Sequence, residues 1–377
     1  MKEVSLYIHI PFCKQRCFYC DFPTFAGKER FREEYVEALI KEIEDKCSNY
    51  LIKTIFIGGG TPSYLEEKEL EKLLILVSKL NLSDKLEYSM ECNPGTVNEE
   101  KLKIMKKYGI NRISFGLQSC NDQLLKKIGR IHTFKEFLEN YNLARKVGFN
   151  NINIDLMYGL PNLTIQDWKN TLEKICELKP EHISAYSLII EEGTAFYKLY
   201  EKDKLELPSE DDERVMDKLT KDILKSNGYH QYEISNFALS GKECEHNKVY
   251  WSLEEYIGVG SASSSYIDGY RLVNTSNIND YIEKINNNIS VVIDKYENSI
   301  EDEMEEFVFM GLRMVSGIDL LKFKKKFGVD INSIYKEVIE KNIKGGLLVV
   351  EKNKMFLTAK GMELSNSVMS DFILDKS

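Results

Sequence analysis

The first 190 residues alternate short apolar runs with stretches of helical period, and this alternation limits the fold more than any other feature. The runs are rich in β-branched residues, and the stretches between them place apolar residues on one helical face. The expected strands are Val4–His9, Thr54–Ile57, Leu86–Met90, Arg112–Phe115, Asn151–Asp155 and His182–Leu188. The expected helices are Phe31–Ile43, Glu66–Leu80, Glu99–Lys107, Thr133–Val147 and Thr164–Leu178. Because alternating β and α segments form parallel strands with right-handed crossovers, the pattern predicts an α/β fold, a partial (β/α)6 barrel of the TIM type.

A doubly wound dinucleotide-binding sheet is the alternative α/β fold. That fold carries a G-x-G-x-x-G turn directly after its first strand. Here the residues after Val4–His9 include three cysteines and no such glycine pattern. The open barrel is therefore the preferred prediction.

Two further segments follow the predicted barrel core of residues 1–190. Residues 191–290 are rich in Gly, Ser, Asn and Tyr and are expected to extend the barrel. Residues 291–377 are rich in Lys and Glu, and they contain two short apolar runs, Leu347–Val350 and Met355–Leu357, that predict a β-hairpin. Helices around such a hairpin resemble a small winged-helix domain.

Composition excludes several classes of function. The net charge of −9 gives no basic surface for nucleic acid, and no apolar run reaches the length of a membrane span. The start, Met1 to Ser5, shows no signal peptide, and eight cysteines without an export signal favour a reducing compartment. We therefore expect a cytoplasmic protein without a nucleic-acid partner.

Three cysteines, Cys13, Cys17 and Cys20, follow the first predicted strand with the spacing C-x3-C-x2-C. Three thiolates at this spacing can hold three irons of a [4Fe–4S] cube, which leaves the fourth iron free for a small-molecule ligand. Zinc is the alternative, but zinc usually takes four ligands in paired short spacings, and no second Cys or Cys/His pair stands nearby. The triplet therefore predicts an iron–sulfur cluster with one open coordination site.

The triplet and the preceding run Tyr7-Ile-His-Ile-Pro11 resemble the radical S-adenosylmethionine (SAM) superfamily. The resemblance is strongest to the branch that holds oxygen-independent coproporphyrinogen III oxidases and HemW-type heme chaperones, and it runs through nearly the whole chain. It implies that the amino and carboxylate groups of SAM chelate the open iron. An electron from the cluster would then cleave the sulfonium to a 5′-deoxyadenosyl radical.

Polar or glycine-rich residues follow each predicted strand, where an α/β barrel gathers its reacting groups. The run Gly58–Thr61 follows the second strand, Glu91 ends the third, and Asp155 ends the fifth. Each could serve only a tight turn or a buried backbone group. Their shared position at consecutive strand ends favours a common ligand instead.

The resemblance assigns these positions to two SAM sites. Tyr7, Gly59 and Glu91 match residues that bind the SAM on the cluster. A second SAM site, known in the oxidase, is matched by Tyr19, Gly60, Thr61, Gln118, Arg130 and Asp155. The chaperone branch need not use that second molecule.

Two departures separate this chain from the oxidase pattern. The cysteine pattern of the oxidases looks like C-x3-C-x2-C-x-C, and here Phe22 stands in place of the fourth cysteine. They also carry a segment before the first barrel strand, whereas here that strand is predicted to begin at Val4. Both differences favour the chaperone branch.

The element His246-Asn247-x-x-Tyr250-Trp251 matches the H-N-x-x-Y-W element associated with heme in HemW-type proteins. A neutral imidazole is a good axial ligand for heme iron, and the two aromatic rings could stack on a porphyrin. The alternative from composition alone is an ordinary packed corner.

The resemblance therefore implies a heme chaperone that holds a [4Fe–4S] cluster, SAM and heme, and delivers heme to acceptor hemoproteins. The alternative is the oxidative decarboxylation of coproporphyrinogen III, and a third option is radical modification of another substrate. Phe22 and the short segment before the first strand argue against coproporphyrinogen dehydrogenase activity, and the third option stays open because no substrate acid or base is identifiable. A dimer and peripheral contact with membrane respiratory complexes are open alternatives for its assembly.

Overall fold

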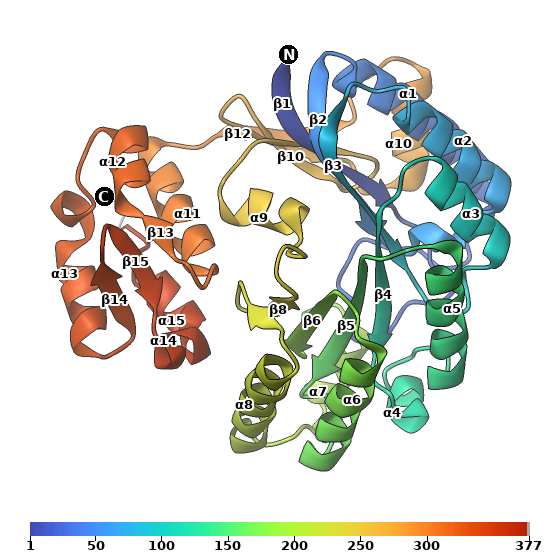
Figure 1. The fold of residues 1–377 in the computed structure, drawn as a ribbon. Coiled ribbons are helices and arrows are strands. Elements are labelled where there is room, and N and C mark those ends of the chain that lie inside the picture. The colour runs from blue at the N-terminus through green and yellow to red at the C-terminus, as the bar shows by residue number, and fades with distance from the viewer. Residues whose placement is uncertain (375–377) are drawn as a thin grey trace.

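A single twelve-stranded sheet dominates the computed structural model, which describes residues 1–374 (Figure 1). Its order is β12-β11-β10-β9-β1-β2-β3-β4-β5-β6-β8-β7. The first six strands are β1 (Lys2–Ile10), β2 (Tyr50–Gly59), β3 (Leu82–Cys92), β4 (Arg112–Gln118), β5 (Ile152–Tyr158) and β6 (His182–Ser187). The others are β7 (His230–Gln231), β8 (Asn236–Ala238), β9 (Tyr256–Val259), β10 (Ser264–Ile267), β11 (Tyr270–Asn274) and β12 (Val292–Glu297). Strands β1 to β6 pair in parallel in chain order, which confirms the predicted α/β barrel core.

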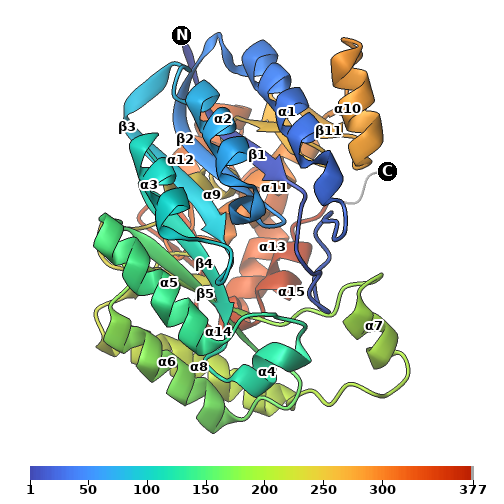
Figure 2. The same ribbon diagram turned by 90° about the vertical axis from the view of Figure 1, so that its right-hand side faces the viewer.

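Helices cover the outer face of this sheet, where Figure 2 shows several of them side by side. The helices that precede residue 290 are α1 (Arg32–Cys47), α2 (Glu67–Val77), α3 (Glu99–Lys107), α4 (Asp122–Lys127), α5 (Phe134–Val147), α6 (Ile165–Leu178), α7 (Ala195–Tyr200), α8 (Glu210–Ser226), α9 (Glu245–Trp251) and α10 (Ile278–Asn286). Of these, α9 lies on the concave side of the sheet (Figure 1). Two short 3-10 helices are Glu29–Phe31 and Pro62–Tyr64. All five helices expected from the periodicity are present, each within a few residues of its predicted bounds. None of the helices in residues 1–374 is both long and apolar enough to cross a membrane.

The barrel strands separate an apolar face from a polar one. In β5, Ile152, Ile154 and Leu156 are fully buried in the hydrophobic core, whereas Asn153 and Asp155 line an interior cavity. Because side chains alternate between the faces of a strand, the odd and even positions lie in different surroundings. The concave face of the sheet is therefore polar, although both faces are buried.

The segment after residue 190 extends the sheet on both sides. Strand β8 pairs antiparallel with β6, and β9 pairs in parallel with β1. Residues as late as Val291 belong to the same hydrophobic core as the barrel strands. Helix α8 and strands β9 to β11 lie where the sequence showed only a less regular stretch.

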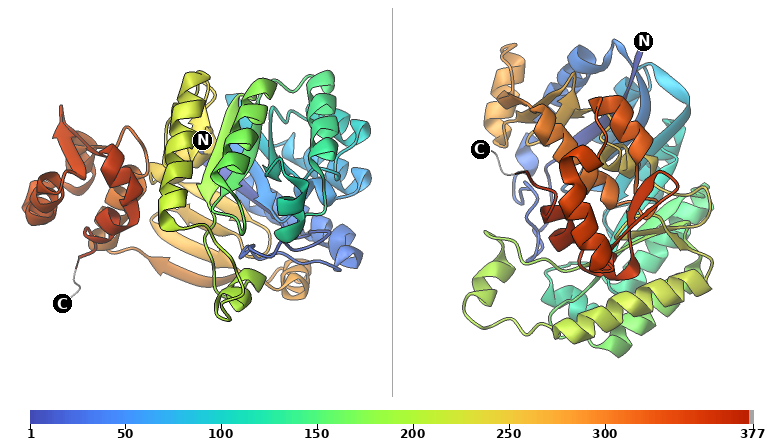
Figure 3. Two further views of the ribbon diagram at one scale, coloured as in Figure 1. Left: turned by 90° about the horizontal axis from the view of Figure 1, so that it is seen from below. Right: turned by 90° about the vertical axis from the view of Figure 1, so that its left-hand side faces the viewer.

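A small C-terminal domain has its own core, and Figure 3 shows it beside the sheet. Its helices are α11 (Ile300–Leu312), α12 (Leu320–Phe327), α13 (Asn332–Lys344), α14 (Ala359–Glu363) and α15 (Ser365–Ser370). Its strands are β13 (Ile318–Asp319), β14 (Leu348–Glu351) and β15 (Lys354–Leu357), in the order β13-β15-β14. The predicted hairpin is the pair β14 and β15. The boundaries at 190/191 and 290/291 stay predictions.

Candidate functional site

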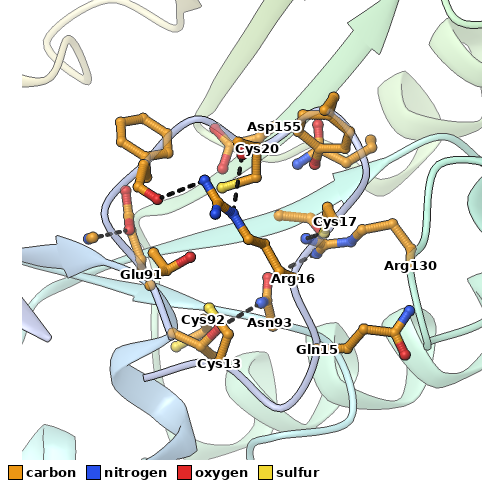
Figure 4. Close-up of a pocket in the computed structure, with 18 of the residues that line it drawn as sticks. Cys13, Gln15, Arg16, Cys17, Cys20, Glu91, Cys92, Asn93, Arg130 and Asp155 are labelled. Carbon is orange, nitrogen blue, oxygen red and sulfur yellow. Dashed lines mark hydrogen bonds between the residues drawn. The ribbon is translucent and has the colours of Figure 1, made fainter. Parts of the chain in front are cut away.

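A loop of residues 11–25 follows β1 and carries the three cysteines. It is closed at its base, where the Cys13 amide donates to the Phe25 carbonyl at 3.0 Å and the Phe25 amide to the Pro11 carbonyl at 2.8 Å. Cys13, Cys17 and Cys20 all line one cavity of about 130 Å³, which we call the cysteine cavity (Figure 4). The loop therefore directs the three thiols toward the carboxyl ends of the barrel strands.

The cysteine thiols need a metal partner if they are to ionise. Burial raises the pKa of the Cys13 and Cys20 thiols. Cys13 Sγ lies 3.5 Å from Thr61 Oγ1, and Arg130 Nη1 donates to Cys17 Sγ at 3.5 Å. Bound iron supplies the positive charge that thiolates require, so these residues fit an iron–sulfur cluster.

Within residues 1–374, no three Cys, His, Asp or Glu side chains converge closely enough to hold a single metal ion. A cube that takes one thiolate for each of three irons does not require such convergence. The arrangement therefore fits the cluster better than the zinc alternative.

The glycine run at the end of β2 lets this strand approach the cysteine loop. The Gly60 amide donates to the Ile10 carbonyl at 2.8 Å, and a Cβ on Gly60 would lie 2.9 Å from the carbonyl oxygens of Ile10 and Phe12. Gly59 has φ of +107°, a conformation that favours glycine. Both glycines also line the cysteine cavity, so the tight turn and the ligand-facing wall are the same structure.

Two buried carboxyl groups face the same cavity. Glu91 accepts from the Gly59 amide at 3.1 Å, and burial together with the nearby Asp155 raises the Glu91 pKa to about 8. Asp155 accepts from Ser114 Oγ at 3.1 Å and Asn153 Nδ2 at 2.7 Å, and burial raises its pKa as well. Two buried carboxyl groups fit a cationic ligand, because the positive charge of such a ligand would favour their ionised form.

Arg130 connects the cysteine loop to the strand ends. Its Nη2 donates to Asn93 Oδ1 at 2.7 Å and to the Gly116 carbonyl, while Nη1 holds Cys17. Asn93 in turn donates from Nδ2 to Thr61 Oγ1 at 2.7 Å. Asn93 was missed by the sequence analysis, although it lies in the turn after Glu91 that the analysis singled out.

The structure gathers eight of the nine residues predicted to bind SAM around the cysteine cavity. These eight are Tyr19, Gly59, Gly60, Thr61, Glu91, Gln118, Arg130 and Asp155. Tyr7 instead lines a neighbouring cavity with His9, Tyr250 and Tyr256, and its Oη lies 3.0 Å from His9 Nδ1. Phe22, which replaces the oxidase cysteine, is 60% exposed and lines both cavities.

The H-N-x-x-Y-W element forms α9, and its residues point in different directions. His246 is only 1% exposed, with Nδ1 2.8 Å from Thr54 Oγ1 and Nε2 2.9 Å from Tyr250 Oη. Burial lowers its pKa to about 3, which keeps the imidazole neutral. In this conformation neither ring nitrogen is free to bind iron.

The other residues of the element contact different parts of the molecule. Asn247 lines the interior of the barrel, whereas Arg313 of the C-terminal domain lies 4.4 Å above the ring of Trp251. The packed corner that composition favours comprised His246 and Trp251; in the structure His246 packs against Tyr250, and Trp251 packs against Arg313. Asn247 lines the interior cavity, and Tyr250 lines the smaller cavity next to Tyr7.

Family models match two parts of the chain. The radical SAM superfamily matches residues 7–175, and the HemN C-terminal domain matches residues 298–364. Among solved structures, coproporphyrinogen III oxidase (HemN) from Escherichia coli superposes with a TM-score of 0.87 at 22% identity, covering 99% of this chain and 90% of that one. At this identity the likeness shows the fold alone.

Curated relatives are more similar in sequence. The heme chaperone HemW of Bacillus subtilis (strain 168) is 39% identical over 374 residues, covering 98% of this chain and 99% of the relative. The heme chaperone HemW of Lactococcus lactis subsp. lactis (strain IL1403) is 40% identical over 377 residues, covering 99% and 98%. The chain therefore belongs to the HemW family of heme chaperones, within the radical SAM superfamily.

Proposed function

We propose that this chain is a cytoplasmic heme chaperone that binds a [4Fe–4S] cluster, SAM and heme, and delivers the heme to acceptor hemoproteins. The names of its full-length relatives support the chaperone assignment. One structural observation carries the cofactor assignment: Cys13, Cys17 and Cys20 line one cavity with eight residues predicted for SAM. A dimer and contact with membrane respiratory complexes stay predictions from the resemblance.

The protein's own residues would hold the cluster in place. Cys13, Cys17 and Cys20 would bind three irons, and Arg130 would fix the position of Cys17 through its Nη1 contact. When both are bound, the cluster and SAM would supply the chemistry in which one electron cleaves the sulfonium of SAM. The closed base of the loop and the Gly60 contact would keep the thiols at a fixed distance from the strand ends.

Glu91 and Asp155 would receive the positively charged part of SAM. Both carboxyl groups are buried and face the cysteine cavity, and neither forms an ion pair among the described residues. A carboxylate that gains a cationic partner is stabilised in its ionised form. Binding of the positively charged SAM would therefore favour release of a proton from Glu91.

The α9 element would contribute to heme binding from the other side of the barrel interior. Asn247 lines the interior in this conformation. His246 would bind iron only after it exchanges its hydrogen bonds to Thr54 and Tyr250. The proposed heme contact at His246, Asn247, Tyr250 and Trp251 therefore includes a rearrangement of α9.

The test uses the full chain, reconstituted with iron and sulfide under anaerobic conditions. We expect about four irons per chain, as the cube requires, and a Soret band when heme is added. Transfer to an apo-hemoprotein should move this band to the acceptor. A Soret band that stays at the position of free heme would contradict the chaperone function, and vinyl product from coproporphyrinogen III with SAM would support the oxidase instead.

A further inference from the structure

A second cavity lies inside the barrel, next to the cysteine cavity. Its volume is about 470 Å³, and it is lined by residues of strands β2 to β6 together with Asn236 of β8 and Asn247 of α9. The two cavities have six lining residues in common: Tyr19, Phe22, Glu91, Ser114, Asp155 and Tyr186. A ligand in this inner cavity would therefore sit beside the cluster site.

Arg112, the first residue of β4, lines the inner cavity and is 2% exposed. Its neighbour Ile113 packs into the hydrophobic core on the opposite face of the strand, so the alternation of β4 turns the arginine inward. Its Nη1 donates to Ser89 Oγ at 3.5 Å, and its Nε has no partner. A guanidinium carries five N–H donors and stays charged, so most of its binding capacity is unused.

The carboxyl groups around Arg112 are already engaged elsewhere. Glu87 accepts from the backbone amides of Glu245 and His246 at 2.9 and 3.1 Å, at the start of α9. Asp155 accepts from Ser114 and Asn153. Among the described residues no carboxylate oxygen lies within the 4.0 Å of an ion pair with Arg112. The nearby carboxyl groups of Glu87 and Asp155 stabilise the buried charge of Arg112 without a direct ion pair, so the free N–H groups of the guanidinium remain available to an anionic group of a ligand.

The remaining lining of the inner cavity defines the kind of ligand. The lining is mixed: apolar side chains such as Phe56, Met157 and Leu188 stand beside the amides of Asn236 and Asn247 and beside four carboxyl groups, those of Asp21, Glu91, Asp155 and Glu191. The carboxyl groups of Glu91 and Asp155 on the same wall would repel a dianionic phosphate more than a single carboxylate. Arg112 is the single basic side chain among the described residues that line the cavity, so a carboxylate of the ligand would bind at Arg112 and the apolar part of the ligand on the other walls.

We propose that Arg112 binds a carboxylate of the ligand in the inner cavity. This inference rests on the proposed function, under which the carboxylate is a heme propionate. The guanidinium fork matches a carboxylate with two parallel hydrogen bonds, and the aromatic and aliphatic walls contact the porphyrin. Arg112 is thus a specificity residue for the acidic edge of the cargo.

The test compares heme with heme dimethyl ester, in which both propionates are blocked, by absorbance titration of the reconstituted protein. Wild type should bind heme at least about tenfold more tightly than the ester, the scale of one charge-assisted hydrogen-bonded pair. Arg112→Gln should reduce heme affinity to the level of the ester and leave ester affinity unchanged. Arg112→Lys, which keeps the charge and loses the fork, should lie between the two.

The outcomes separate this inference from the function on which it rests. A wild type that binds neither compound contradicts the heme chaperone function and the inference with it. If the wild-type protein binds heme and the ester with equal affinity, the chaperone function stands but the proposed role of Arg112 is wrong. This outcome does not depend on whether the variants fold. Iron content and SAM affinity are measured on each variant, and loss of SAM binding with heme binding intact assigns Arg112 to the cofactor instead.

Discussion

Short sequence motifs predicted both the cysteine cavity and a binding role for helix α9, but the proposed metal-binding side chains of these motifs are accessible to a ligand only in the cysteine cavity. The cysteines and the strand-end residues meet around one cavity, with Glu91 and Asp155 facing it. The imidazole of His246 in α9 is buried instead, and both of its ring nitrogens are hydrogen-bonded to protein side chains. A motif thus identifies residues that belong together in space, whereas their hydrogen-bond partners decide whether they are available to a ligand.

The largest expected effect is the loss of the cluster when one cysteine is removed. Cys20→Ala should abolish the [4Fe–4S] absorbance and reduce bound iron, because three thiolates are needed for three irons. Cys120→Ala is the matched control, since Cys120 lies on a different, partly buried surface and lines no part of the cysteine cavity. An unchanged cluster spectrum in Cys20→Ala would contradict the site.

A smaller effect is expected at Gly60, because a methyl group there would press on the backbone of the cysteine loop. Gly60→Ala should destabilise the protein by about 1–3 kcal/mol in chemical denaturation, the usual cost of overpacking, and lower the iron bound after reconstitution. Gly27→Ala, in the segment just after the loop, meets no atom within 4 Å, and only its φ of +72° is strained. Equal iron content in the two variants would refute the close contact.

The affinity for SAM should depend on pH through Glu91. A carboxyl group with its pKa near 8 is mostly neutral at pH 7, and binding of the positively charged sulfonium compound SAM favours the ionised form. SAM affinity should therefore rise as pH increases from 6.5 to 8, by up to about tenfold per unit, and Glu91→Gln should remove this slope. Equilibrium dialysis measures the affinity, and cluster absorbance without SAM serves as the control. The same slope in Glu91→Gln would exclude this carboxyl group.

The smallest effect concerns α9 and addresses the comparison directly. Tyr250→Phe removes the hydroxyl bonded to His246 Nε2 and lowers the cost of releasing the imidazole by about 1 kcal/mol, the usual net worth of one hydrogen bond. If His246 reaches heme iron after a rearrangement, heme affinity should rise a few-fold and the Soret band should shift. Tyr256→Phe, beside it in the same cavity, is the control. An unchanged Soret band in Tyr250→Phe and in His246→Ala would show that α9 serves packing alone.

Local sequence patterns were enough to predict the barrel strands, five of the helices and the cysteine site. The period-two and helical repeats located β1 to β6 and five covering helices, because burial on one face leaves a regular trace in the sequence. The family resemblance assigned nine residues to SAM, and eight of them line one cavity with the cysteines, since parallel strands end at the same edge of a barrel.

Tertiary structure alone decided the remaining features. The pairing of β9 with β1 joins residues about 250 positions apart, and no local repeat encodes such a contact. The same holds for the engagement of Glu87 by α9, which leaves Arg112 unpaired in the barrel interior. The sequence named the chemical groups, but the hydrogen bonds and burial that make them available or unavailable depend on segments brought together only by the fold.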